Sequence, residues 1–281
     1  MAQIVGGFIM PHEPGIFYMP EAKWTDGQRR VLAAFDAIRA RIGELGATTV
    51  IVVGADHYVL FGPTCLPSYV IGIGDVSGPY ERFATIKQGE IANNVPLALH
   101  IAQYGRAHGF DWAVAKSINV DHSIGVPARV CALPNAAVRG VIPVYLASGV
   151  EPFISMQRAY ALGGLIRDAV EAWPQDERVV VIGSGGISHW VGLPQMGKVN
   201  PDFDRKILDC VVSGDPAAML ALSDDEVLEQ GGNGAFEIRQ FLCMMGALPG
   251  VGGRLIAYEH GPEWVTGLGF AEVGNDLGRQ A

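Results

Sequence analysis

Residues 26–57 read DGQRRVLAAFDAIRARIGELGATTVIVVGADH, and this stretch decides the fold class. Its first part predicts a helix over residues 26–45, because apolar side chains recur at spacings of three and four and therefore share one face. These side chains belong to Val31, Phe35, Ile38, Ile42 and Leu45. Gly46 supplies a C-terminal stop, and the β-branched run at residues 48–54 predicts a strand just before His57. A helix followed by a strand is one unit of an α/β fold.

The same alternation continues on both sides of this stretch. Further strands are predicted at residues 3–10, 69–73, 112–115, 141–146, 178–182 and 254–258. Further helices are predicted at about residues 91–108, 155–173, 202–212 and 235–247. The alternation favours an α/β fold with a central, mostly parallel or mixed β-sheet flanked by helices. Residues 61–90 have weak periodicity and are a candidate loop over a site. No repeat or charge run marks a boundary, so we expect a single compact domain over residues 1–281.

Composition excludes several classes of function. The hydrophobic share of 49% against 17% charged residues is typical of a packed globular chain and argues against disorder. A net charge of −9 opposes binding to nucleic acid and to anionic membranes, because no basic cluster offsets the repulsion. An anionic substrate would need local positive charge.

The N-terminal residues 1–15 lack the basic region, apolar stretch and cleavage site of a secretory signal, so we expect a cytoplasmic protein. No apolar run approaches the roughly 18 to 20 residues that span a bilayer. The cysteines are scattered without a CxxC pair, which predicts buried thiols in place of disulfides or a thiolate zinc site. They are Cys65, Cys131, Cys210 and Cys243.

Four of the seven histidines lie in short segments that resemble strand ends or turns: His12, His57, His122 and His189. Ligands of open α/β sheets gather at the carboxyl ends of strands, so histidines placed there can converge on one site. The alternative for each histidine taken singly is a hydrogen-bonded residue of a loop or core. Their repeated placement favours the first interpretation for the group.

Glu237 lies in a predicted helix beside Phe236 and Phe241, whose side chains favour burial. A buried carboxylate needs a partner. Two interpretations stay open from the residues alone: Glu237 ligates a metal, or it lies on a polar face and pairs with Arg239 or solvent.

Two common motifs fail in the segment GSGGIS at residues 183–188. The segment follows a strand, but Ser188 occupies the last glycine position of the dinucleotide-binding fingerprint and no clear helix begins there. Ser188 beside His189 does not indicate a serine hydrolase, because the G-x-S-x-G elbow is absent. No role is assigned to the three other histidines, which are His100, His108 and His260.

Five motifs in order resemble class III extradiol ring-cleaving dioxygenases, in particular the catalytic β-subunit type of protocatechuate 4,5-dioxygenase. The motifs are Pro11-His12, Asp56-His57, Val120-Asp121-His122, the segment at residues 183–189, and Gly234-Ala235-Phe236-Glu237 with the run at residues 245–248. Together they span nearly the whole chain. The resemblance implies an α/β fold and cleavage of a catecholic ring by O2.

Carried over residue by residue, the resemblance implies that His12, His57 and Glu237 ligate Fe(II). It makes His189 the acid/base residue, and His122 an assisting residue near substrate and oxygen. Two imidazoles and one carboxylate suit a divalent first-row metal and leave positions open for substrate. A histidine that shuttles protons is useful because the catechol must lose protons to chelate. The implied product is a ring-opened acid that carries both atoms of O2.

One departure from the two-subunit members is that this chain contains no small helical α subunit, so it uses a partner or covers its own site. A homo-oligomer is a separate expectation. Residues 1–15 and 60–78 resemble the branch that acts on lignin-derived biaryl catechols. Two alternatives stay open: a metal-binding adaptor of the same superfamily without ring cleavage, and a zinc-dependent hydrolase, since two histidines and a glutamate also suit zinc.

Overall fold

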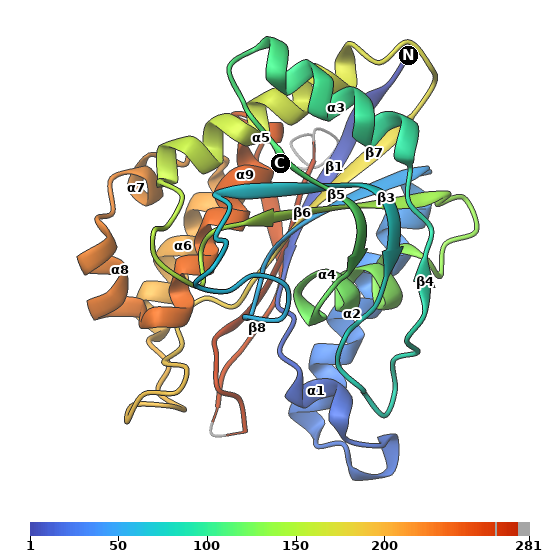
Figure 1. Cartoon of the computed structure of the whole chain (residues 1–281). Helices are drawn as coiled ribbons and strands as arrows, with labels where there is room; N and C mark the ends of the chain where they lie inside the picture. The colour runs from blue at the N-terminus through green and yellow to red at the C-terminus, as the bar shows by residue number, and fades with distance from the viewer. Residues whose placement is uncertain (262, 275–281) are drawn as a thin grey trace.

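A mixed sheet runs through the middle of the protein, and helices cover both of its faces (Figure 1). The computed structural model describes residues 1–261 and 263–274. Within those residues the sheet has nine strands in the order β4-β3-β6-β2-β7-β1-β9-β8, with β5 beside β3. The strands are β1 (Gln3–Met10), β2 (Thr49–Ala55), β3 (Tyr69–Ser77), β4 (Glu90–Ile91), β5 (Ala113–Asn119), β6 (Gly140–Leu146), β7 (Arg178–Ser184), β8 (Gly253–Glu259) and β9 (Leu268–Val273).

The helices vary from single turns to five turns. They are α1 (Gly15–Tyr18), α2 (Asp26–Glu44), α3 (Val95–Ala107), α4 (His122–Val126), α5 (Met156–Glu171), α6 (Pro201–Ser213), α7 (Ala217–Leu220), α8 (Asp224–Gly231) and α9 (Ile238–Ala247). Short irregular turns complete them: the 3-10 turns η1 (Glu21–Lys23) and η3 (Asn233–Glu237), and the π-helical turn η2 (Pro127–Ala132). Of these helices, none is both long and apolar enough to cross a membrane.

Four neighbouring strands at the centre, β6, β2, β7 and β1, pair in parallel. Their carboxyl ends therefore lie along one edge of the sheet. The outer pairings β3–β6, β3–β4, β1–β9 and β8–β9 are antiparallel, so the sheet is mixed, as predicted. This confirms the α/β fold with helices on both faces.

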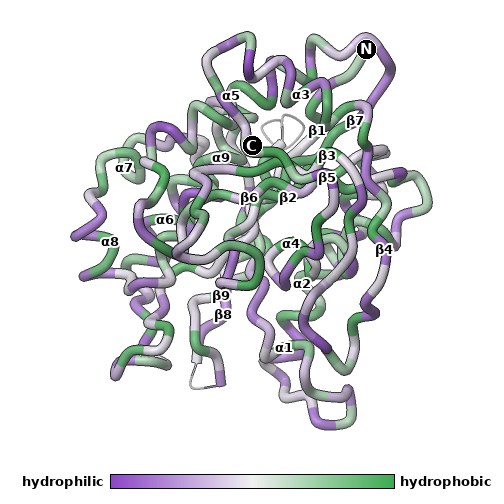
Figure 2. Tube along the Cα trace, viewed as in Figure 1, coloured by the Kyte–Doolittle hydropathy of each residue, from purple (hydrophilic) through white to green (hydrophobic). Residues whose placement is uncertain are grey.

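The strand β2 explains how one sheet serves two apolar cores. Every residue of β2 is buried, and successive side chains point to opposite faces. Ile51 and Val53 join the core beneath α3, α5 and α9, whereas Val50 and Val52 join the core beneath α2. In Figure 2 the segments of β2 and α9 are largely hydrophobic, whereas the segment around α8 is more hydrophilic.

The predicted elements are found with shifted ends. The predicted helix at 91–108 begins only at Val95, because Ile91 pairs in β4 and Asn94 caps the helix. The predicted helix at 235–247 begins with a 3-10 turn before α9. The strand β9 was not predicted, because its buried Glu272, paired with arginines from α2 and β8, breaks the apolar pattern. The prediction of buried thiols is correct for three cysteines but wrong for Cys65, which is exposed.

Candidate active site

Three neighbouring parallel strands bring chemistry-bearing residues to one edge of the sheet. The chain leaves β1 at Met10 and reaches His12, leaves β2 at Ala55 and reaches His57, and leaves β7 just before the segment that carries His189. The expected convergence of histidines at the carboxyl ends of strands is therefore what the structure has.

The closest cluster joins two of these histidines to a carboxylate from another element. Nε2 of His12 and Nε2 of His57 each lie 3.2 Å from Oε1 of Glu237. The His12 and Glu237 side chains are buried, whereas the His57 side chain is about one-third exposed. The cluster is thus buried on the protein side and open on the His57 side.

Glu237 reaches this cluster from the turn η3 that leads into α9. The backbone N–H of Gly186 donates to Oε2 of Glu237 at 2.7 Å, which leaves Oε1 directed at the two imidazoles. Arg239 instead donates to Asp224 and to the carbonyl of Ile154. The alternative in which Glu237 pairs with Arg239 or solvent is therefore not what the structure has.

The far nitrogen of each imidazole has its own partner. Nδ1 of His12 lies 2.9 Å from the hydroxyl of Ser184, and Nδ1 of His57 lies 2.8 Å from Oδ2 of Asp121. Tyr145 in turn donates its hydroxyl proton to Asp121 at 3.0 Å. Partners of this kind fix the orientation of histidines that ligate metals, with Nε2 left free for the ion.

Electrostatics at the cluster favour a bound cation. Burial would raise the pKa of Glu237, yet the imidazoles of His12 and His57 hold it well below its usual value. Burial would lower the pKa of His57, but its bonds to Asp121 and Glu237 raise it well above the usual value. Burial lowers the pKa of His12. These shifts favour a neutral His12 and a protonated His57 between the ionised carboxylates of Glu237 and Asp121. A divalent ion can bind in this place by displacing the proton of His57.

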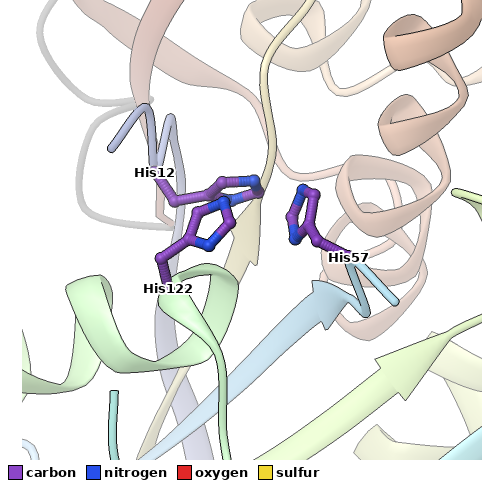
Figure 3. A group of neighbouring side chains, drawn as sticks. All are labelled: His12, His57 and His122. Atoms are coloured by element: carbon purple, nitrogen blue, oxygen red, sulfur yellow. The ribbon is translucent and has the colours of Figure 1, made fainter. Parts of the chain in front are cut away.

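His122 begins α4 and lies against the same cluster (Figure 3). Nitrogen atoms of His12, His57 and His122 all lie within 4.8 Å of one another. The His122 ring stacks on the His57 ring with centroids 4.1 Å apart. The structure thus brings His122 to the edge of the cluster.

His189 follows the carboxyl end of β7 and so approaches from the same edge of the sheet as His12 and His57. Its Nε2 lies 4.0 Å from Oε2 of Glu237, and the side chain is largely buried. Two glycines make room for its ring: a Cβ at Gly234 would meet Nε2 at 2.1 Å, and a Cβ at Gly186 would meet Cε1 at 2.9 Å. The ring is therefore seated in a space that side chains at these positions would fill.

A cavity of about 260 Å³ opens beside these groups. It is lined by Asp56, His57, Tyr58, Ser148, Gly149, His189, Val191, Asn233, Gly234 and Glu237. Its volume is close to the lower end of the range for ligand pockets, about 300 Å³. A single aromatic ring is an occupant of suitable size.

A family model described as the catalytic LigB subunit of aromatic ring-opening dioxygenase matches residues 6–269 of this chain. The chain belongs to this family. The match takes in His12, His57, His122, His189 and Glu237, and it confirms the resemblance drawn from the five motifs. As a LigB-family member, the protein is an oxidoreductase, a ring-cleaving dioxygenase of the extradiol type.

Named relatives of this LigB-family chain carry the name 2,3-dihydroxyphenylpropionate/2,3-dihydroxicinnamic acid 1,2-dioxygenase. The relative from Rhodococcus globerulus is 28% identical over 298 residues, which cover 89% of this chain and 91% of that protein. The relative from Cupriavidus necator is 28% identical over 290 residues, which cover 86% and 88%. The crystal structure of an uncharacterized protein from Escherichia coli K12 covers 96% of this chain and 100% of that one, with a TM-score of 0.60 and 12% identity. That last likeness shows the fold alone.

The sequence did not predict the residues that form hydrogen bonds with His12, His57 and Glu237 on the side away from the proposed metal position. Asp121 adjoins His122 in the third motif, and a charged residue at a buried turn was a usable signal. Ser184 and Gly186 lie in the motif at residues 183–189, but nothing in the sequence indicated that they would contact His12 and Glu237. The three remaining histidines lie elsewhere: His100 contacts the carbonyl of Ala169, His108 caps α3, and the ring of His260 lies against that of Tyr258.

Proposed function

We propose that this LigB-family protein uses Fe(II) to cleave the ring of a catecholic aromatic acid at a C–C bond next to, and not between, the two hydroxyl-bearing carbons, with insertion of both atoms of O2. The observation that carries the proposal is the convergence of two imidazole Nε2 atoms on one carboxylate oxygen, each at 3.2 Å, beside an open cavity. Two histidines and one carboxylate with open positions are the ligand set typical of non-haem Fe(II) oxygenases.

In this proposal His12, His57 and Glu237 hold the iron. The fit rests on the donor set, because Ser184 and Asp121 occupy the Nδ1 atoms of the two histidines and Gly186 occupies the second oxygen of Glu237. Each ligand is left with one donor atom for the ion. Bound ferrous iron would supply the redox chemistry between a chelated catechol and O2.

The protein groups manage the protons. A catechol must lose protons on binding, and His189 lies at the cavity wall where it can accept or return one. We assign it the acid/base role. His122, on the other side of His57, assists near substrate and oxygen. Burial of both imidazoles limits their exchange of protons with bulk water.

The proposed substrate is a substituted catechol. The relatives from Rhodococcus globerulus and Cupriavidus necator are named for a dihydroxyphenyl acid, and residues 60–78 resemble the lignin-derived biaryl branch. Both kinds of substrate carry a bulky or acidic group on the catechol ring. Tyr58, Val191 and Asn233 line the cavity, and the first two are more than half exposed, so these are the side chains that such a group would meet.

We also propose that residues 1–281 act as one catalytic domain in the cytoplasm, as the sequence predicts. A homo-oligomer is the proposed assembly, and the need for a small α-type covering subunit is tested by the activity of the isolated chain. No nucleic acid or membrane is proposed as a partner.

The test is metal analysis of anaerobically purified protein together with oxygen uptake on a panel of catechols. We expect bound or restorable iron, activity that fades in air and returns on reduction with added Fe(II), and both atoms of labelled O2 in the product. Full activity of a zinc-only protein without oxygen consumption would identify a hydrolase instead. Tight metal binding without turnover of any catechol would support an adaptor.

A further inference from the structure

A carboxylate that no motif pointed to lies behind His122. Oε1 of Glu81 is 2.6 Å from Nδ1 of His122, and both side chains are mostly buried. An ionised carboxylate can only accept a hydrogen bond, so the proton of the neutral imidazole resides on Nδ1. Nε2 of His122 is then left with its lone pair free.

The segment that carries Glu81 is fastened to the site. The N–H of Tyr80 donates to the carbonyl of Val120 at 2.7 Å, one residue before the cap of α4. Arg129 donates to the carbonyls of Gly78 and Gly89 at 3.0 and 2.6 Å and so ties both ends of the loop together. Glu81 therefore has a fixed position relative to His122.

The arrangement repeats what the structure does at the two neighbouring histidines. His12 has Ser184 on its Nδ1, His57 has Asp121, and His122 has Glu81. The three rings gather at one point, as Figure 3 shows. We propose that Glu81 is a positioning residue that holds His122 in its Nδ1–H form, so that Nε2 faces the site as a proton acceptor.

The other interpretation of this cluster is a second metal site formed by Glu81, Asp121 and His122, whose ligand atoms lie within 4.8 Å of one another. Hydrogen bonding argues against it. Both oxygens of Asp121 already accept hydrogen bonds from surrounding groups, and Oε1 of Glu81 is taken by His122. In the described part of the chain, Oε2 of Glu81 is buried without a hydrogen-bond partner. A buried acceptor without a donor is costly, so we expect water or a substrate hydroxyl to donate to it.

The inference rests on the proposed function for its kinetic effect but not for its structural one. In metal-free protein labelled with ¹⁵N-histidine, nuclear magnetic resonance should place the proton of neutral His122 on Nδ1, and Glu81→Gln should move population to the Nε2–H form. Glu90→Gln is the matched control, because it removes the same charge from an exposed side chain at the end of the same loop. An Nε2–H form in the unaltered protein would overturn the inference even if no catechol is turned over.

The kinetic arm uses iron-loaded protein with catechol and 2,3-dihydroxyphenylpropionate as probes. Glu81→Gln should lower kcat by about 10- to 100-fold with iron content and KM nearly unchanged, an effect of the size found when the partner that orients a metal-bound histidine is lost. In a His122→Phe background the same change should alter kcat by less than about twofold, because Glu81 acts through His122. Losses that multiply in the double variant would show a general structural role and overturn the inference. Absence of turnover in the unaltered protein would count against the proposed function alone.

Discussion

Asp121 binds His57 at two points. Its Oδ2 accepts the backbone N–H of His57 at 3.1 Å and lies 2.8 Å from Nδ1 of the same residue. Burial opposes ionisation of Asp121, but the hydrogen bond from His57 holds the pKa of the carboxyl well below its usual value. One carboxylate thus fixes both the backbone and the ring of a proposed iron ligand.

Asp121→Asn should weaken iron binding without unfolding the protein. The amide keeps an oxygen that can accept from Ser123 at the start of α4, but it lacks the charge that holds His57 with Nε2 free. Changes of this kind usually cost about 10- to 100-fold in metal affinity or activity. Competition with a chelator measures the affinity, and Asp209→Asn, an exposed aspartate of α6, is the control. Equal affinities of the two variants would contradict the prediction.

Substitutions of the proposed ligands and of the proposed base should fail in different ways. His12→Ala, His57→Ala and Glu237→Ala should be folded but poor in iron, because two remaining groups bind a labile divalent ion weakly.

His189→Gln should keep its iron and lose turnover by roughly 10² to 10⁴, the usual effect of a positioned acid or base. His100→Ala, on α3, is the control and should be nearly silent. Iron content and single-turnover rates separate the two classes. If His189→Gln lost iron while Glu237→Ala kept it, the assignment of ligand and base would be reversed.

Substrate scope should follow the group attached to the catechol ring. Contacts remote from the reacting atoms can orient the ring and raise the rate, so carboxylated or biaryl catechols should exceed plain catechol in kcat/KM. Tyr58, which lines the cavity, is 60% exposed and has a φ of 59°, a left-handed conformation that bulky residues seldom adopt. Tyr58→Ala should reduce the preference while plain catechol changes little. The highest kcat/KM for plain catechol would count against this.

The strand-end histidines were predictable because a parallel sheet gives sequence position a spatial meaning. A buried β-branched run followed by His57 predicts a side chain at the carboxyl edge, and the same holds for His12 and His189. Glu237 was different. Its helical context allowed a polar face as readily as a buried one, and only the resemblance to a family selected the second interpretation.

The supporting residues could not be predicted, because their roles depend on contacts between segments distant in sequence. Glu81 reaches His122 across 41 positions, and Asp121 reaches His57 across 64. Helix and strand periodicity relate only residues a few positions apart, so they cannot predict either contact. Residues 61–90 were expected as a candidate loop over a site. The strand β3 (Tyr69–Ser77) runs through the middle of this segment, and Glu81 lies in the loop that follows the strand.

The packing of α5 on α9 makes a prediction about stability. A Cβ at Gly163 would lie 1.9 Å from the carbonyl oxygen of Cys243, so the two helices would have to separate. Gly163→Ala should therefore lower the free energy of unfolding by about 1 to 3 kcal/mol. At Gly164 the nearest atom is 3.8 Å away, and Gly164→Ala should be neutral or stabilise by up to about 1 kcal/mol through helix propensity. Urea unfolding midpoints measure both effects. Equal midpoints for the two variants would show that α5 and α9 can separate at little cost in free energy.

The space around His189 gives the last prediction. A Cβ at Gly234 would lie 2.1 Å from Nε2 of His189, so Gly234→Ala must displace the imidazole from its present position. The ring is the end of a movable side chain, and the fold should survive with its iron in place. The loss should approach that of His189→Gln, roughly 10² or more in kcat, if proton transfer depends on the position of this ring.

Gly62→Ala is the matched control, because a Cβ there meets nothing within 4 Å. The double variant Gly234→Ala with His189→Gln distinguishes displacement of His189 from a general distortion of the site, because only a general distortion would add a further loss. Once His189 cannot transfer protons, displacing its side chain should cost little more. Full activity of Gly234→Ala, with its fold and iron content unchanged, would mean that the position of His189 seen here is not the one that acts on substrate.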